Sequence, residues 1–256
     1  MLFEGNFIVR RWRNIISAVP IVILLFNTGV LADELTVLCP PPLRTTLTEL
    51  APLFERESGH RLLVGYEPSK AIVGHVKSGE VPDIAILTAS NVDELRAQGL
   101  IEGRVDLVRS RIGIAVRTGA AAPDVSTAEA FKRTLLAAKS FARNEGADSG
   151  IYMASLLERL GIDEQMQGKT ILVRSGYVAE LVANGQAEIG AQQVSELMSV
   201  AGVAVFPLPP GLQHVLTFSA GVAKRPKAPD AVAAFLRFVA SSAAAAVIKA
   251  KGLEPA

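Results

Sequence analysis

Residues 34–65 read ELTVLCPPPLRTTLTELAPLFERESGHRLLVG, and this stretch decides the fold. A short β-rich run, 35–39, leads through three prolines into a helical pattern, and a second β-rich run follows at 61–65. A strand, a helix and a second strand in this order form the unit from which parallel sheets are built. The stretch therefore predicts an α/β fold that begins near Glu34.

The same alternation continues through the rest of the chain. Further strand patterns, separated by helical patterns, lie at 83–87, 111–116, 170–173, 188–191, 203–206 and 216–222. No fixed-period repeat is visible, so the pattern does not indicate a repeat architecture. The length after residue 32 suits one large domain or two lobes, and we predict two lobes.

The first 32 residues have the composition of a cleavable secretory signal. Arg10, Arg11 and Arg13 precede an apolar run at 15–26, and small residues stand one and three positions before Asp33. An uncleaved anchor helix is the alternative, because the apolar run is close to the length that spans a bilayer. We therefore expect the signal to cover residues 1–32 and the mature protein to work in the periplasm.

Composition excludes several classes of function. Removing residues 1–32 leaves 23 basic and 24 acidic residues, a balance that does not suggest a nucleic-acid partner. The single cysteine, Cys39, can form no internal disulfide and is most simply a buried core residue. His60, His75 and His214 are isolated in sequence and show no metal-ligand spacing. We expect no cofactor and no metal centre.

Catalytic motifs are absent from the sequence as well. The chain contains no G-x-S-x-G elbow, no Walker-type loop and no recognisable general base beside a nucleophile. We therefore predict that the protein is not an enzyme, with a cryptic hydrolase or lyase as a distant alternative.

Hydroxyl residues stand near the start of four predicted helices. Thr46 and Glu49 have the spacing of a capping box, and Ser69, Ser149 and Ser175 each precede a helical pattern. Such residues ordinarily cap free backbone N–H groups. The functional alternative is that several helix N-termini converge and offer N–H donors and positive dipole ends to an anion.

The chain after residue 32 resembles the periplasmic molybdate-binding proteins of ABC transporters, which have the type II periplasmic binding-protein fold. The resemblance covers nearly all of residues 34–256, and its specificity comes from the order and spacing of several loose motifs. These motifs are 35–38 leading into 43–54, 82–86 with Ala89, 150–161, 181–182 with Ala187, 189–190, and an alanine-rich C-terminal helix that ends near Gly252.

This resemblance implies two α/β lobes with two mixed, mostly parallel sheets joined by a two-strand hinge. It implies a first lobe of residues 33–112 and 207–256 and a second lobe of residues 113–206. It also implies that the lobes close on a small oxyanion by hinge motion.

The resemblance implies a divergent ligand site. The first serine of the family site falls on Pro42, which offers neither a hydroxyl nor an N–H group. The candidate ligand-binding residues are Arg44, Ser69, Lys70, Ser149, Ser175 and Gln193, with Arg174 as a further cation. Gln192 replaces Gln193 if the strand register slips by one residue. Arg44 and Lys70 either face the ligand or point to solvent.

The resemblance and these residues together imply a periplasmic solute-binding protein that captures a small anion for an inner-membrane ABC permease. An arginine fork suits planar carboxylates or phosphate, so the ligand is either a molybdate-like oxyanion or an organic acid. The protein is expected to act as a monomer. A sensing protein that presents its bound form to a membrane sensor is the alternative function.

Overall fold

The structure is a computed structural model that describes residues 32–256. The predicted signal segment, apart from Ala32, lies outside the described residues.

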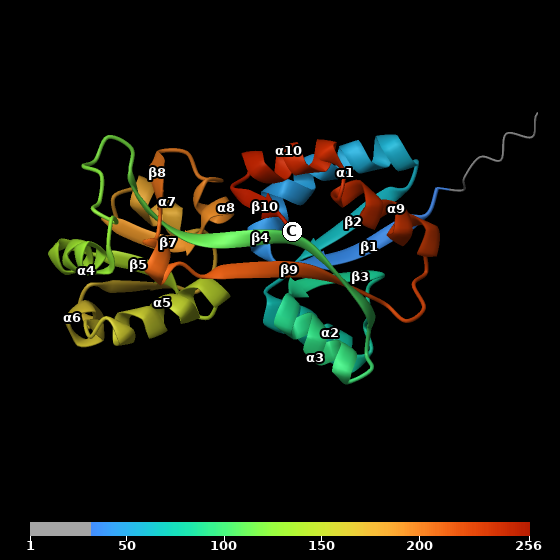
Figure 1. Cartoon of the computed structure of the whole chain (residues 1–256), viewed down its shortest axis with the longest axis horizontal. Helices are drawn as coiled ribbons and strands as arrows, with labels where there is room; N and C mark the ends of the chain where they lie inside the picture. The colour runs from blue at the N-terminus through green and yellow to red at the C-terminus, as the bar shows by residue number, and fades with distance from the viewer. Residues whose placement is uncertain (1–31) are drawn as a thin grey trace, which may run out of the picture. The chain divides into compact units, whose positions relative to one another are not determined.

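The first sheet gathers strands from both ends of the described chain (Figure 1). Its strand order is β2-β1-β3-β9-β4, with β10 also paired to β4. The pairs β1–β2 and β1–β3 are parallel, whereas β9 runs antiparallel to β3 and to β4. The strands are β1 (Glu34–Cys39), β2 (Arg61–Tyr66), β3 (Ile84–Thr88), β4 (Glu102–Arg117), β9 (Val215–Val222) and β10 (Leu253–Pro255).

Helices cover both faces of the first sheet. One face carries the helices α1, α9 and α10, and the other carries α2 and α3 (Figure 1). These helices are α1 (Arg44–Ser58), α2 (Ser69–Ser78), α3 (Ala89–Ala97), α9 (Pro229–Val239) and α10 (Ser242–Ala250), and a 3₁₀ turn, η1 (Pro41–Leu43), precedes α1.

The second sheet has the order β4-β7-β5-β6, with β8 also paired to β4. Its β5 strand is parallel to β6 and to β7, and β4 is antiparallel to β7 and β8. The strands are β5 (Phe141–Asn144), β6 (Thr170–Val173), β7 (Ile189–Gln193) and β8 (Val203–Pro207). The accompanying helices are α4 (Ala128–Ala137), α5 (Asp148–Arg159), α6 (Asp163–Gln167), α7 (Val178–Ala183), α8 (Val194–Leu197) and the 3₁₀ turn η2 (Pro210–Leu212).

One strand, β4, belongs to both sheets. Its N-terminal part pairs with β9 and β10 as far as Arg111, and its C-terminal part pairs with β7 and β8 from Ile112 onward. The chain returns through β9, which begins at Val215 after η2. Two long strands therefore pass between the sheets, and their positions fix how the two sheets are connected.

The predicted α/β class is confirmed. The strands predicted at 35–39, 61–65, 83–87, 170–173, 188–191, 203–206 and 216–222 agree with the structure to within two residues at each end. The strand predicted at 111–116 is only the second part of β4. β5 and β10 were missed, because the sequences FARN and LEP are short and contain polar residues or proline.

The predicted capping box at Thr46 and Glu49 is wrong. The 3₁₀ turn at η1 runs directly into α1, so the helix starts at Arg44 and its N-cap residue is Leu43. The hydroxyls of Ser69 and Ser149 lie within the first turns of α2 and α5, and neither helix has a side-chain cap. The predicted hydroxyl residues therefore leave the first backbone N–H groups of these helices uncapped.

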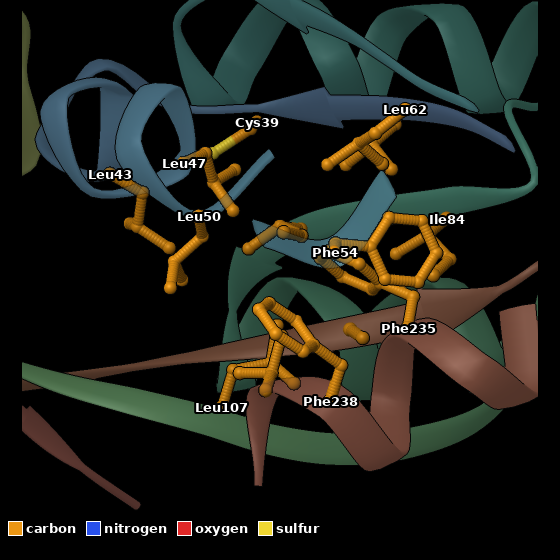
Figure 2. Close-up of a cluster of buried hydrophobic side chains, with 14 of the residues drawn as sticks. Cys39, Leu43, Leu47, Leu50, Phe54, Leu62, Ile84, Leu107, Phe235 and Phe238 are labelled. Atoms are coloured by element: carbon orange, nitrogen blue, oxygen red, sulfur yellow. The ribbon is translucent and has the colours of Figure 1, made fainter. Parts of the chain in front are cut away.

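The largest hydrophobic core lies between α1, α9 and the first sheet (Figure 2). Phe54 of α1 is fully buried, and its ring centre lies 5.5 Å from Phe235 and 5.7 Å from Phe238 of α9. Cys39 is a free, buried cysteine in the same cluster, as predicted. This packing holds the C-terminal helices on the sheet that begins the chain.

Within residues 32–256, no single helix is long and apolar enough to cross a membrane. α9 and α10 together reach the required length and composition, but they are bent by 65° relative to one another.

A buried carboxylate joins three separate segments of the first sheet. Asp83 is 2% exposed and accepts hydrogen bonds from the backbone N–H and the hydroxyl of Thr36, at 2.9 and 2.6 Å. The backbone N–H of Lys227, before α9, donates to its other oxygen. Burial alone would raise the pKa of Asp83, but these hydrogen bonds to the charged form lower it below the ordinary value of 3.8.

We expect Phe54→Ala to reduce the free energy of unfolding by about 3–5 kcal/mol, because it removes a fully buried ring from the core. Urea unfolding measures the loss. Leu63→Ala is the control, since Leu63 is 41% exposed. A similar loss in both variants would contradict the expected contribution of the buried Phe54 ring to the free energy of unfolding.

Asp83→Asn is expected to lower the free energy of unfolding by about 1–3 kcal/mol at pH 7, because a neutral amide cannot replace a buried carboxylate that accepts these donors. The native pKa is lowered, so the carboxylate's contribution is present above pH 3.8 and is lost as the pH falls through the native pKa. The difference between wild type and variant in urea unfolding should therefore shrink at pH 3. If the difference in the free energy of unfolding between wild type and Asp83→Asn stayed constant with pH, Asp83 would not be ionised in the native state. The control is Glu57→Gln, because Glu57 is exposed.

Candidate functional site

The two sheets meet where η1 and the start of α1 approach α8, and we call this region the junction. The Ser195 hydroxyl of α8 donates a hydrogen bond of 2.7 Å to the carbonyl oxygen of Pro42 in η1. Gly252 lies so close to Met198 that a Cβ there would stand 2.6 Å from its sulfur. The resemblance expects a ligand donor at the position of Pro42. In the structure, Pro42 instead joins η1, which precedes a helix of the first sheet, to α8, which accompanies the second sheet.

Arg44 is the first residue of α1, and its guanidinium lies over an aromatic ring. Its guanidinium carbon is 4.2 Å from the ring centre of Tyr66, at the end of β2. No ion pair holds Arg44 among residues 32–256, so its N–H groups are not neutralised by a neighbouring carboxylate there. This cation–π contact holds the guanidinium near the ring while its N–H groups stay available for an anion.

Tyr66 is partly buried at the end of β2. Burial raises the pKa of Tyr66, a hydrogen bond with Thr48 and the charge of Arg44 oppose this rise, and Cys39 and Tyr177 add to it.

Ser69 and Lys70 are the first two residues of α2. Ser69 is partly buried, whereas Lys70 is exposed and forms no ion pair within the described part of the chain. The first N–H groups of a helix have no acceptor in the helix itself, so this turn offers backbone donors as well as a cation.

Ser149 lies in the first turn of α5, which starts close to the end of β5. A Cβ on the next residue, Gly150, would stand within 2.0 Å of the Asn144 carbonyl oxygen, so only glycine permits this approach. Ser149 is 1% exposed, and its hydroxyl has no hydrogen-bond partner among the described residues. A buried hydroxyl without a partner is costly and is a place where a ligand could supply the missing bond.

Ser175 stands in the exposed turn between β6 and α7 rather than at a helix start. The next residue, Gly176, has a φ of +89°, a backbone conformation that side chains other than hydrogen disfavour. Arg174, the further candidate cation, forms an ion pair with Glu145 at 3.1 Å.

The two glutamines at the end of β7 have different partners. The Gln193 side-chain oxygen accepts a hydrogen bond of 2.7 Å from the Ser110 hydroxyl of β4, and its side-chain nitrogen is buried without a partner within residues 32–256. The Gln192 side-chain oxygen accepts from the backbone N–H of Val178, which starts α7. Gln192 thus holds a helix in place, whereas Gln193 retains a free amide donor.

No hydrogen bond or ion pair within residues 32–256 joins any two of the six predicted site residues. Two cavities in the described chain lie elsewhere. One, of about 260 Å³, is lined by Arg143, Glu158 and neighbours on α5, α6, β5 and β6. The other, of about 790 Å³, is lined by residues of β1, β2 and the ends of α2, including Glu67 and His75. Neither cavity is lined by a predicted site residue.

Sequence reasoning missed three titratable residues that influence one another's charge, Asp148, Glu196 and His214, which we call the acid–histidine cluster. Asp148 begins α5, Glu196 belongs to α8 and His214 precedes β9. The His214 ring stacks on Tyr152 of α5, with 4.5 Å between ring centres and 11° between ring planes. His214 was described as isolated, and it is isolated only in sequence.

Burial and mutual charge shift the pKa of each member. Burial and, to a smaller extent, the charge of Asp148 raise the pKa of Glu196 to about 8, against the opposing hydrogen bonds of Gln192 and Gln193. Burial also raises the pKa of Asp148, opposed by His214. The pKa of His214 is lowered by burial, with Asp148 opposing the shift and Arg159 adding to it. These shifts depend on residues that are distant in sequence, and no local motif signals them.

The cluster does not have the geometry of a metal centre. Among residues 32–256, no group of three or more His, Cys, Asp or Glu side chains is arranged to hold a metal ion. The chemistry that the cluster can perform is proton transfer, because it combines carboxyl groups with raised pKa values and a neutral imidazole.

The chain shares substantial sequence identity with a known enzyme. Over 246 residues the chain is 35% identical to aconitate isomerase from a Pseudomonas species, which covers 91% of this chain and 94% of that protein. The prediction that the protein is not an enzyme is contradicted by this match. That prediction rested on the absence of a nucleophile beside a base, and an isomerase that moves a proton needs no nucleophile.

Two solved structures share the fold at low sequence identity. The periplasmic molybdate-binding protein of Azotobacter vinelandii is 18% identical with a TM-score of 0.71, covering 86% of this chain and 98% of that one. A tungstate-binding protein of Desulfovibrio alaskensis is 15% identical with a TM-score of 0.67, covering 88% and 99%. The predicted likeness to molybdate-binding proteins and their two-lobe type II fold is therefore confirmed.

A family model described as bacterial extracellular solute-binding protein matches residues 35–254. This match spans almost every strand and helix of the two sheets, including both strands that pass between them. The protein is thus a member of the bacterial extracellular solute-binding protein family.

Proposed function

We propose that the protein binds aconitate and interconverts its cis and trans isomers. The observation that carries this proposal is the 35% identity to aconitate isomerase along 91% of the chain. Aconitate is a propene that bears three carboxylates, so the proposal agrees with the organic acid considered in the sequence analysis. It favours the organic acid over the molybdate-like oxyanion.

The residues on the first-sheet side of the junction suit a polycarboxylate. Arg44 offers a planar fork that is held against Tyr66, and planar forks bind carboxylates through two parallel hydrogen bonds. Lys70 adds an exposed positive charge at the start of α2. Fixed neutral dipoles bind a compact tetrahedral oxyanion better. In the proposed site, cationic side chains stand at some positions where the molybdate-binding family has neutral residues.

The residues on the second-sheet side supply neutral donors. Ser149 and Gln193 each keep a buried polar atom without a partner in the described chain, and Ser175 stands at an exposed turn. Together with uncapped helix starts, these groups can bind the remaining carboxylates. In this proposal residues 33–112 and 207–256 form one lobe, residues 113–206 form the other, and the lobes close on the ligand as a monomer.

A second candidate function is capture of the same anion for an inner-membrane ABC permease, without turnover. Membership of the solute-binding family favours it. Presentation of the bound form to a membrane sensor would use the same binding step. Both alternatives require binding of a carboxylate in the periplasm but no change in the ligand.

We expect purified protein to convert cis-aconitate into trans-aconitate, and the reverse, until one equilibrium ratio is reached from both sides. Proton NMR of the vinyl and methylene signals follows the reaction. Calorimetric titration with aconitate, molybdate, tungstate, sulfate and phosphate accompanies it. Tight aconitate binding without turnover would favour the receptor function, and tight binding of molybdate alone would contradict the proposal.

Arg44→Ala should weaken aconitate binding by about 10–100-fold, because a charge-assisted hydrogen bond to carboxylate contributes about 1.5–3 kcal/mol. Calorimetry and the KM of the isomerisation both measure this loss. The matched control is Arg56→Ala, which removes an exposed arginine near the other end of α1. Equal affinity in wild type and Arg44→Ala would remove Arg44 from the site.

A further inference from the structure

The acid–histidine cluster differs from an ordinary solvated group of charges. Glu196 is 7% exposed, and neither it nor Asp148 forms an ion pair with any residue in the range 32–256. A buried carboxyl without a cation is unfavourable when ionised. Asp148 lies in the first turn of a helix, where the dipole normally stabilises an ionised carboxylate, yet its pKa is raised. Both carboxyl groups therefore hold a proton more strongly than an exposed carboxyl group does.

Two buried donors adjoin the cluster and lack partners among the described residues. The Ser149 hydroxyl follows Asp148 in the first turn of α5. The Gln193 side-chain nitrogen belongs to a residue whose backbone contacts Glu196. Both residues are 1% exposed. Unfilled donors beside titratable carboxyls point to a bound anion that would complete their hydrogen bonds.

We propose that Asp148 moves the proton in aconitate isomerisation, with Glu196 and His214 as positioning residues that act on it electrostatically. This inference rests on the proposed function. Asp148 is selected because it is partly exposed and adjoins Ser149, whereas Glu196 is buried. The class of chemistry is an allylic proton shift, in which one carboxylate serves first as base and then as acid.

The step balances without a further reactant. An Asp148 oxygen takes a proton from the methylene carbon, so a C–H bond breaks and an O–H bond forms. The released electron pair forms a double bond to the central carbon, and the original double-bond pair moves to the far carbon and its carboxylate. Asp148 then returns the proton to that far carbon. The rotamer in which the methylene arm is held determines whether the new double bond is cis or trans.

Glu196 gives the proposal a pH signature. Its pKa is raised to about 8, so it is mostly neutral at pH 7 and ionises above pH 8 beside Asp148. The described neighbours that act on the cluster are Gln192 and Gln193 at Glu196, and Arg159 at His214. Ionised Glu196 would repel an anionic substrate, so kcat/KM of the wild type should fall above pH 8.

The experiment compares wild type with Asp148→Asn, Glu196→Gln and His214→Asn in aconitate turnover and in deuterium uptake from D₂O. Asp148→Asn should lower kcat by about 10²–10⁴-fold. Its affinity for tricarballylate, the saturated tricarboxylate that cannot isomerise, should stay within a few-fold of wild type. Glu196→Gln should remove the fall in kcat/KM above pH 8. His214→Asn should reduce kcat less than Asp148→Asn does.

Controls separate this inference from the proposed function and from misfolding. Asp163→Asn removes an exposed acid from the first turn of α6 and should keep wild-type turnover. Asp148→Ala should regain activity on addition of formate, which a purely structural role would not allow. Absence of turnover in the wild type would overturn the proposed function. An active wild type with an equally active Asp148→Asn, or with His214→Asn as the most damaged variant, would overturn the assignment to Asp148.

Discussion

The structure depends on one strand that serves two sheets. β4 has to satisfy the register of β9 and β10 in one half and that of β7 and β8 in the other. The change of partners falls at Arg111 and Ile112, beside Ser110, whose buried hydroxyl donates to Gln193. Because backbone hydrogen bonds of a strand fix both distance and register, the position of the second sheet follows from this strand. The placement of the candidate site residues that belong to different sheets depends on the same strand.

The helices that carry Arg44, Ser69 and Ser149 begin without a side-chain cap, as do α3, α6, α7, α8 and α9. Among the described helices, side chains cap α4 and α10, through Thr127 and Ser241. At α1, α2 and α5 the N-cap residues are Leu43, Pro68 and Ala147, which cannot accept an N–H hydrogen bond through a side chain. An anion that binds these turns would therefore replace a missing cap, and binding and local helix stability would be coupled.

A binding fold and an isomerase are compatible in physical terms. A receptor holds an anion by donors arranged in advance, and the same arrangement favours a carbanion whose charge spreads into a carboxylate. What distinguishes the two functions is a group that can take and return a proton. Fold does not settle this question, because function resides in particular side chains. In this chain Asp148, Glu196 and His214 are the residues that bear on it.

The sequence and the tertiary structure determine different features of this protein. Hydrophobic alternation determined the α/β class and most strands, because that signal is local and survives in a single sequence. The resemblance supplied candidate residues such as Ser149 and Gln193, but not their unpartnered atoms. β5 escaped prediction because FARN has no local apolar pattern and is a strand only between β6 and β7. The sequence by itself determined the composition of the helix starts, whereas only tertiary structure brought residues 148, 196 and 214 together, because pKa shifts arise from burial and charges that are close in space rather than in sequence.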